Sequence, residues 1–346
     1  MREDPDFEVR EPRLDGRAAP VLEVEGLQTH FAMRAGLAKA VDGVSFEVGR
    51  GEVLGIVGES GSGKSVTGFS VLGLVDPPGE IIGGSVKFRG EELAGADPAR
   101  LRALRGAKIA MIFQDPMMTL NPVLRVDTQM IEAVRAHGDV SRAAARERAR
   151  EALARVGIPA PDERLYAYPH QLSGGMRQRV AIAIAFLNAP ELIIADEPTT
   201  ALDVTIQAQI LSEAQKLCRE EGTALIWITH DLAVVAGLAD RIAVMYAGRI
   251  VEQGTTDDVI DRPLHPYTVG LLGSVPGAGR RGQPLTQIPG MTPDLTRLPP
   301  GCAFQARCPR ATAACGAAPE PAARAVGHQA RCHHPHLAPA AEGSLA

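Results

Sequence analysis

Short apolar runs followed by short polar or glycine-rich segments recur along this chain. Residues 21–27 (VLEVEGL) alternate between apolar and polar positions, which is typical of a half-buried β-strand, and residues 41–48 predict another. Residues 52–57 (EVLGIV) form an apolar run that leads into a glycine-rich turn, and a helical pattern follows from about Lys64 to Leu74. The N-terminal part is therefore expected to contain a buried strand, a turn and a helix in direct succession.

Strand and helix patterns alternate through the rest of the chain. Further strands are predicted at residues 84–88, 108–113, 191–196 and 224–229, and a β-hairpin at 241–254 around Ala247–Gly248. Helices are predicted at residues 126–157, 174–188 and 204–221. The strands ELIIAD and ALIWIT are mostly apolar, as parallel strands covered on both faces are, and the helix between them completes a βαβ unit. The pattern predicts an α/β fold.

Composition and charge place the chain among ordinary globular proteins. Its length of 346 residues favours about two domains. Of these residues, 45% are apolar and 22% are charged, which is ordinary for a globular protein. The net charge of −5 provides no basic surface for nucleic acid, which argues against non-specific nucleic-acid binding. No run reaches about 18 uninterrupted apolar residues, so membrane association is expected to require a partner protein.

Both ends of the chain and one internal stretch differ in composition from the rest. Residues 1–20 are polar and lack the apolar segment of a secretory signal, so a disordered tail is expected there. Residues 275–301 are rich in proline and glycine and predict a linker or an extended wrap, and residues 337–346 predict a loose tail. The sequence contains no internal repeat, so each motif below occurs once.

The strongest chemical signal is a glycine-rich turn that matches the pattern G-x-x-x-x-G-K-[ST]. It comprises Gly58, Glu59, Ser60, Gly61, Ser62, Gly63, Lys64 and Ser65. The glycines let the backbone curl around phosphates so that successive N–H groups face the anion, and the following helix adds its positive end. Lys64 is expected to reach the β- and γ-phosphates and Ser65 to bind Mg²⁺, which predicts an ATP-binding P-loop. A chance glycine-rich turn leaves the strand before it and the helix after it unexplained.

Two carboxylates end the apolar run at residues 191–196 and the position after it. Asp196 is expected to hold Mg²⁺ through water, and Glu197 to orient and polarise the water that attacks the γ-phosphate. A solvated loop usually explains such a pair when it stands alone. Its position downstream of a P-loop favours the catalytic interpretation.

A second anion-binding turn opens the helix predicted at 174–188. Ser173, Gly174 and Gly175, within the sequence LSGGM, combine a helix N-cap with small residues. The stretch resembles the signature sequence of ABC proteins, in which two nucleotide-binding domains pair head to tail. The signature of one domain then caps the γ-phosphate held by the other. The resemblance gives a reason for two phosphate cradles in one chain, where LSGG alone could be only a capped helix start.

The resemblance to ABC proteins implies a fold as well as a site. The implied fold is a P-loop NTPase with a RecA-like core, an antiparallel β-subdomain and a helical signature subdomain at about residues 115–180. This nucleotide-binding domain is expected to span residues 21–262. The residues that match the family's catalytic glutamate (Glu197), switch histidine (His230) and signature are all present, so the site is expected to be intact.

Further positions match the ABC pattern in the expected order. Phe31 resembles the aromatic residue that stacks on adenine, although an ordinary core residue explains it too. The remaining matches are Gln114 as the Q-loop ligand of Mg²⁺, Asp203 in the D-loop Ala201–Asp203 at the dimer interface, and His230 as the switch histidine at the γ-phosphate. Residues 166–171 resemble the segment that contacts the coupling helices of membrane subunits, and an aromatic surface loop explains them nearly as well.

Four cysteines gather near the C-terminal end, separated by five, six and sixteen residues. They are Cys302, Cys308, Cys315 and Cys332. Four thiolates can hold a four-iron cluster or a structural Zn²⁺, but the spacing lacks the C-x₂-C pairs usual for zinc. Unligated or redox-active thiols are the other interpretation. Nearby histidines could replace a thiolate, namely His328, His333, His334 and His336.

A second resemblance concerns this C-terminal region. The segments His265–Tyr267, Leu298–Phe304 and Arg307–Pro309 look like the C-terminal extension of dipeptide/oligopeptide ABC importer ATPases, which is expected to span residues 263–336. In that family the four cysteines are associated with a four-iron, four-sulfur (4Fe–4S) cluster. The branch also includes importers of nickel, glutathione and other small cargo, which remain alternatives to peptide.

Together these resemblances imply an ATP-hydrolysing subunit of a peptide importer, bound to the cytoplasmic face of the cell membrane. Its implied partners are a second ABC ATPase, related or identical, two transmembrane permease subunits and an extracytoplasmic substrate-binding protein. Its implied cofactors are ATP, Mg²⁺ and the 4Fe–4S cluster. Two other interpretations are a soluble ABC ATPase that acts on nucleic acid or ribosomes, and a detached exporter ATPase. Both fit less well, because the chain has one motif set and carries the importer-type extension.

Overall fold

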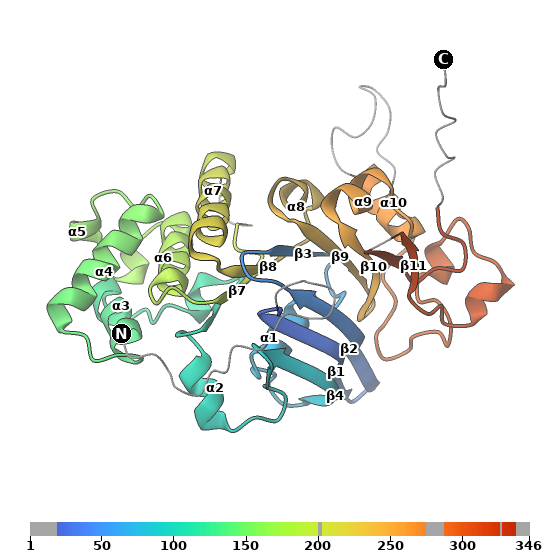
Figure 1. The fold of residues 1–346 in the computed structure, drawn as a ribbon, viewed down its shortest axis with the longest axis horizontal. Helices are drawn as coiled ribbons and strands as arrows, with labels where there is room; N and C mark the ends of the chain where they lie inside the picture. Colours follow the sequence, from blue (N-terminus) through green and yellow to red (C-terminus); the bar gives the residue numbers. More distant parts are fainter. Residues whose placement is uncertain (1–18, 200–202, 275–286, 326, 337–346) are drawn as a thin grey trace, which may run out of the picture.

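Two β-sheets organise the chain. The computed structural model describes residues 19–199, 203–274, 287–325 and 327–336. A four-stranded sheet has the order β2-β1-β4-β5, and an eight-stranded sheet has the order β11-β12-β10-β9-β3-β8-β7-β6. Helices α3 to α6 gather at one end of the molecule, and the C-terminal residues lie at the opposite end (Figure 1).

The strands are β1 (Leu22–Met33), β2 (Gly36–Val48), β3 (Val53–Val57), β4 (Gly79–Phe88), β5 (Glu91–Glu92), β6 (Ile109–Ile112), β7 (Leu192–Asp196), β8 (Ala224–Thr229), β9 (Arg241–Tyr246), β10 (Arg249–Thr255), β11 (Ala322–Ala325) and β12 (His328–Ala330). The helices are α1 (Lys64–Val71), α2 (Pro98–Leu104), α3 (Val126–Arg135), α4 (Arg142–Arg155), α5 (Pro161–Arg164), α6 (Gly174–Phe186), α7 (Val204–Glu221), α8 (Leu232–Leu238), α9 (Thr256–Asp261) and α10 (Pro266–Gly273). No helix within these ranges combines the length and the apolarity needed to cross a bilayer.

The predicted strands and the β-hairpin are confirmed, with β1, β2 and β4 longer than their patterns indicated. The hairpin joins β9 to β10 and turns at Ala247 and Gly248, both of which have positive φ. Such backbone angles match a tight hairpin turn. The predicted tails at 1–20 and 337–346 lie almost wholly outside the described residues, as does part of the predicted linker at 275–301.

The helical prediction for 126–157 is confirmed over most of the range, but the range is divided into two helices. Helix α3 ends at Arg135, and α4 begins after Ser141, whose hydroxyl accepts a hydrogen bond from the Ala144 N–H at 3.2 Å. The intervening Gly138 lowers helix propensity, and a serine at this position satisfies the free N–H groups of a new helix. The alanine- and arginine-rich sequence of α4 and the Gln, Met, Glu and Ala residues of α3 all favour helix, so the break between them is not evident from composition.

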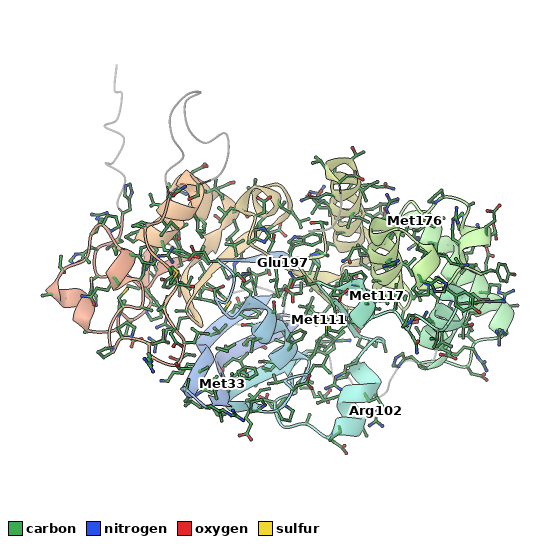
Figure 2. All side chains as sticks on the ribbon, turned by 180° about the vertical axis from the view of Figure 1, so that it is seen from behind. Met33, Arg102, Met111, Met117, Met176 and Glu197 are labelled. Carbon is green, nitrogen blue, oxygen red and sulfur yellow. The ribbon has the colours of Figure 1, made fainter. Side chains whose placement is uncertain are left out.

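The antiparallel sheet covers the helix that follows the glycine-rich turn. The Thr29 hydroxyl of β1 lies 2.7 Å from the Ser70 hydroxyl of α1, and both residues are buried. In Figure 2, Met33 on this sheet and Met176 on α6 lie in separate parts of the molecule. The antiparallel sheet and the helical part are therefore separate regions of the structure.

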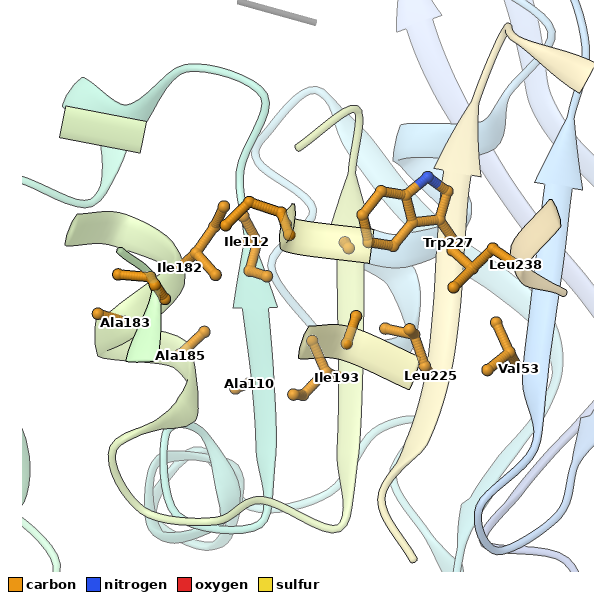
Figure 3. Packing of buried hydrophobic residues seen from close by; sticks show 14 of the residues in the cluster. Val53, Ala110, Ile112, Ile182, Ala183, Ala185, Ile193, Leu225, Trp227 and Leu238 are labelled. Carbon is orange, nitrogen blue, oxygen red and sulfur yellow. The ribbon is translucent and has the colours of Figure 1, made fainter. Parts of the chain in front are cut away.

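Five parallel strands, in the order β9-β3-β8-β7-β6, form the centre of the larger sheet. Every residue of β3, β7 and β8 is buried, as the nearly continuous apolar sequence of each strand predicts. Figure 3 shows one face of this core, where Ile182 of α6 lies beside Ile112 of β6, and Leu238 of α8 lies near Trp227 and Val53. The opposite face packs against α1 and the antiparallel sheet.

The C-terminal region adds to the same sheet. Strand β12 pairs antiparallel with β10, through Glu252 opposite Ala330, and β11 pairs with β12. Residues 287–301 form no helix or strand, and the backbone N–H of Lys39 in β2 donates to the Leu295 carbonyl at 3.3 Å. The extended wrap predicted for 275–301 is thus confirmed where the structure describes it.

The packing of α8 on β3 gives a stability prediction. A Cβ atom at Gly55 in β3 would overlap the Cγ1 of Val235 in α8. Gly55→Ala is therefore expected to lower the free energy of unfolding by about 1–3 kcal/mol, because the filled core must shift to accept the methyl group. Urea denaturation measures the change.

Gly237 provides the matched control. It lies on the exposed side of α8, and a Cβ there would meet no atom within 4 Å. Gly237→Ala should leave the free energy of unfolding unchanged or raise it slightly, because alanine favours helices over glycine. Equal stability of Gly55→Ala and the wild type would contradict the described contact between α8 and β3.

Candidate nucleotide-binding site

The carboxyl ends of four neighbouring parallel strands bring the predicted site residues to one edge of the sheet. Strand β3 leads into the glycine-rich turn, β7 ends at Asp196, β8 is followed by His230, and β6 is followed by Gln114. Ligands of open α/β sheets bind at this edge, beyond the carboxyl ends of the strands. The strand order β3-β8-β7-β6 therefore accounts for a site assembled from residues far apart in sequence.

The glycine-rich turn passes very close to two other backbone segments. A Cβ at Gly58 would overlap the Met245 carbonyl, and a Cβ at Gly63 would overlap the Ala40 carbonyl. Both glycines have positive φ, at 158° and 102° respectively. Glycine is required at these two positions for space as well as for backbone conformation.

Lys64 is buried at the start of α1 and is held by the turn itself. Its ammonium donates to the carbonyls of Gly58 at 2.8 Å and Glu59 at 3.0 Å, and its side chain is 5% exposed. Burial is the largest influence and lowers the pKa of Lys64, while the nearby carboxylates of Asp196 and Glu197 oppose that shift. A cation with only carbonyl partners at its tip is well placed to exchange them for phosphate oxygens.

Ser65 and Asp196 are in direct contact. The Ser65 hydroxyl donates to Oδ1 of Asp196 at 2.9 Å, and Asp196 is 3% exposed. Burial raises the pKa of Asp196, and the hydrogen bond from Ser65 opposes the rise. A hydroxyl and a carboxylate are hard oxygen donors of the kind that Mg²⁺ prefers beside nucleotide phosphates, so this pair fits the predicted metal.

Two predicted residues, His230 and Gln114, contact Glu197. The Nδ1 of His230 lies 3.2 Å from Oε1 of Glu197, and the Gln114 amide nitrogen donates to Oε2 at 3.3 Å. The Glu197 backbone N–H donates to the Ile228 carbonyl at 2.9 Å, which holds the residue against β8. Glu197 has a φ of 45°, an uncommon conformation outside glycine that often marks functional positions.

The predicted signature lies apart from this group. Ser173 is exposed and caps α6, where its hydroxyl accepts from the Met176 N–H at 3.3 Å. Figure 2 labels Glu197 near the middle of the molecule and Met176 on the helical side. The chain therefore holds two helix-opening turns of the predicted type, one at the edge of the sheet and one away from it.

Two other predicted residues occupy simpler positions. The half-buried Phe31 ring packs over Gly79 and beside Val75, and Phe31 pairs with Ala38 across β1 and β2. Asp203 caps α7 by accepting from the Ile206 N–H at 3.0 Å. Residues 201–202 of the predicted D-loop lie outside the described residues. The roles of Phe31 in adenine stacking and of Asp203 at an interface stay predictions.

The four C-terminal cysteines line one cavity, next to His265 and Phe304; they are Cys302, Cys308, Cys315 and Cys332. Burial raises the pKa of Cys302, Cys308 and Cys332, and neighbouring cysteines raise it further. In the part of the chain that the structure describes, no three His, Cys, Asp or Glu side chains are arranged to hold a metal ion. The predicted iron–sulfur cluster therefore gains no support from a metal-site geometry.

Three of the histidines proposed as substitute ligands have other partners. His328 lies 2.9 Å from a Glu252 carboxylate oxygen, His333 lies 3.0 Å from the Ala317 carbonyl, and His334 lies 2.6 Å from the Thr312 hydroxyl. These contacts engage the Nε2 atom of each ring. His333 and His334 also line the cavity of the four cysteines, but the Nε2 atom of each already has a partner.

Sequence reasoning missed two residues that contact the glycine-rich turn. The hydroxyl of Tyr267 accepts from the Glu59 N–H at 2.8 Å, and the guanidinium of Arg307 donates to the Glu59 carboxylate. Both lie in the C-terminal region, more than 200 residues away in the sequence. In the sequence, both residues stand in segments that resemble the importer extension. No local pattern indicates that they contact the glycine-rich turn.

Comparison with known proteins agrees with this geometry. The ABC transporter family profile matches residues 41–200, and the profile of the oligopeptide/dipeptide transporter C-terminal region matches residues 251–315. The chain is similar to the dipeptide transport ATP-binding protein DppD of Bacillus subtilis, with 50% identity over 314 residues, covering 90% of this chain and 94% of DppD. It is also similar to the oligopeptide transport ATP-binding protein OppD of Salmonella typhimurium, with 49% identity over 315 residues, covering 91% and 94%.

Solved structures resemble the chain as well. One is the dimeric structure of MJ0796, a bacterial ABC transporter cassette, with 29% identity and a TM-score of 0.63 over 68% of this chain and 98% of that one. The cassette match covers about two thirds of the chain, and the C-terminal profile includes Cys302, Cys308 and Cys315 but ends before Cys332. The chain therefore belongs to the ABC transporter family, among the ATP-binding proteins of the oligopeptide/dipeptide transporter type.

Proposed function

We propose that this chain hydrolyses ATP to power an importer of dipeptides or oligopeptides. The observation that carries the proposal is the convergence of Lys64, the Ser65–Asp196 pair and Glu197 at one edge of the sheet. The names of the similar DppD and OppD proteins support peptide as the cargo. Nickel, glutathione or another small solute is the alternative cargo for the same machinery.

Each residue of this group has a distinct task in the proposed reaction. The N–H groups of the glycine-rich turn and Lys64 bind the phosphates, and Ser65 and Asp196 hold Mg²⁺, directly or through water, with Gln114 as a further ligand. When bound there, Mg²⁺ would neutralise part of the negative charge of the nucleotide phosphates. Glu197 orients a water for attack on the γ-phosphorus, and the bond to the β-phosphate oxygen breaks to leave ADP and inorganic phosphate. His230 steadies Glu197 and reaches the γ-phosphate.

The separation of Ser173 from Glu197 supports a head-to-tail pair of ATPase subunits. In the proposed pair, Ser173, Gly174 and Gly175 of one subunit cap the γ-phosphate bound by the other. Asp203 lies near the shared interface, and Phe31 stacks on adenine. The dimeric form of the MJ0796 cassette supports such pairing.

The proposed assembly contains a second, related ATPase, two membrane permease subunits and an extracytoplasmic binding protein, on the cytoplasmic face of the membrane. ATP closes the ATPase pair and hydrolysis reopens it, so that the nucleotide biases a two-state element. Residues 166–171 are the proposed contact with the permeases. The proposed domain limits are 21–262 for the nucleotide-binding domain and 263–336 for the C-terminal extension.

Replacement of Glu197 tests the reaction. Glu197→Gln keeps the size of the side chain but removes the charge that polarises water, so turnover should fall by at least about 10²-fold. ATP should remain bound. Steady-state phosphate release and nucleotide retention on the purified full chain measure both effects. Glu191→Gln is the matched control, because Glu191 pairs with Arg89 and Lys108 away from the site. Wild-type turnover in Glu197→Gln would refute this choice of residue.

Co-purification tests the assembly. A tagged full-length chain recovered from detergent-solubilised membranes is expected to bring polytopic membrane proteins with it. The Glu197→Gln variant with ATP should retain them as well, because the pair stays closed. Recovery with ribosomes or DNA in place of membrane proteins would contradict the importer proposal.

The four cysteines are the proposed ligands of a 4Fe–4S cluster. Their common cavity supports this proposal. A cluster binds each thiolate on a different iron and so requires wider spacing between thiolates than a single ion does. The cluster would tie the C-terminal segments together, since ligand binding and folding are linked.

Metal analysis tests the cluster. Protein purified without oxygen is expected to be brown and to contain about four iron and four sulfide per chain. Cys315→Ser should lose much of this content, whereas Cys218→Ser, a buried cysteine of α7 outside the cavity, should keep it. Colourless protein with one zinc per chain would reject the cluster.

A further inference from the structure

The glycine-rich turn is held from outside by a side chain of the C-terminal region. The guanidinium of Arg307 donates to both carboxylate oxygens of Glu59, at 2.6 Å and 2.9 Å. Glu59 is the second residue of the turn, directly after Gly58. A two-point contact of this kind fixes direction as well as distance, which a single ion pair does not.

Arg307 is itself rigidly placed. It is 6% exposed, its Nε donates to the Pro289 carbonyl at 2.8 Å, and a terminal nitrogen donates to the Tyr246 hydroxyl at 3.3 Å. The guanidinium also lies 5.8 Å from the ring centre of Tyr246 and 5.9 Å from that of Phe304. These contacts determine the direction of the Arg307 guanidinium, which meets the Glu59 carboxylate.

The backbone of Glu59 is held by the same region. Its N–H donates to the Tyr267 hydroxyl at 2.8 Å, and the Tyr267 ring is fully buried against Tyr246 and Phe304. The Glu59 carbonyl accepts from Lys64 at 3.0 Å. Movement of Glu59 would therefore displace a carbonyl that positions the phosphate-binding lysine.

The ion pair also has an electrostatic consequence. Glu59 places a carboxylate in the turn that is proposed to surround a polyanion. Paired with Arg307, this carboxylate adds little negative potential to the site. Left without Arg307, it would repel the phosphates and be free to rotate toward them.

We propose that Arg307 is a positioning residue for nucleotide binding, which orients the glycine-rich turn and neutralises its acidic residue through Glu59. The inference rests on the proposed role of that turn in binding ATP. Arg307 acts on the affinity for nucleotide, and the residues that perform hydrolysis remain those around Glu197. Loss of Arg307 should therefore raise the KM and Kd for ATP far more than it lowers kcat.

Arg307→Gln tests this in the full-length chain. Hydrogen bonds to charged groups support an expected rise of about ten- to hundredfold in the Kd for ATP, with kcat at saturating ATP within about threefold of wild type. Arg307→Lys keeps the charge but cannot donate two parallel hydrogen bonds to the carboxylate, so it should give an intermediate Kd. Calorimetric titration with ATP and ADP measures binding, and phosphate release gives KM and kcat.

Glu59→Gln tests whether Arg307 acts through its ion pair with Glu59 or through its other contacts. It removes the repelling charge, so its Kd should rise less than that of Arg307→Gln. The double variant should match Glu59→Gln alone, because Arg307 then has no carboxylate to neutralise. Additive losses in the double variant would overturn the proposed route through Glu59. If Arg307→Gln fails to fold, Arg307→Lys and Glu59→Gln still decide the outcome.

Two controls complete the experiment. Arg331→Gln alters another arginine of the same region, whose acidic partner Glu320 is exposed and 3.8 Å away, and should bind ATP normally. Because Arg307 precedes Cys308, the iron content of each variant is measured as well and should match wild type. A normal KM in folded Arg307→Gln, or a fall in kcat at unchanged KM, would overturn the inference.

Lys64→Ala distinguishes this inference from the function on which it rests. ATP binding should be lost in Lys64→Ala, because the phosphates lose their main cation. Normal ATP binding in Lys64→Ala would contradict the proposed role of the turn in binding ATP. Loss of binding in Lys64→Ala together with normal binding in Arg307→Gln would contradict only the proposed role of Arg307.

Discussion

The close approach of three backbone segments at the glycine-rich turn is the constraint on which the site depends. Gly58 touches the Met245 carbonyl of β9, Gly63 touches the Ala40 carbonyl of β2, and the Gly248 N–H donates to the Ser62 carbonyl at 2.9 Å. The antiparallel sheet and the parallel sheet therefore meet at the turn. Its shape is set by both sheets, which prepares its N–H groups for an anion before the anion arrives.

Burial gives the charged residues of the site their properties. Lys64 and Asp196 are both almost fully buried, and burial moves their pKa values in opposite directions, each toward the neutral form. Nearby groups oppose both shifts, the carboxylates of Glu197 and Asp196 at Lys64, and the Ser65 hydrogen bond and Lys64 at Asp196. A magnesium nucleotide brings both an anion for Lys64 and a cation for Asp196, so its binding satisfies both groups together.

The sequence predicted what is local and missed what is distant. The strand, turn and helix from β3 to α1 follow one another in the chain, and the residues after β7 and β8 are placed by strands of nearly pure apolar composition. The break between Arg135 and Ser141 was missed because its flanking residues favour helix on both sides. The contact between Glu59 and Arg307 spans 248 residues, and no periodicity or motif spacing encodes such a pair. Similarly, the direction of the Phe31 ring depends on Gly79 across the sheet.

The pairing of β12 with β10 means that the cysteine-bearing region is not an appendage that could be cut away. Strand β10 would then end the sheet with open N–H and C=O groups, and the buried Glu252 carboxylate, which also accepts from the Leu264 and His265 N–H groups, would lose its contact with His328. Such an edge invites another chain to add to it. A protein shortened before β11 would thus tend to self-associate, so these C-terminal strands also protect the chain from aggregation.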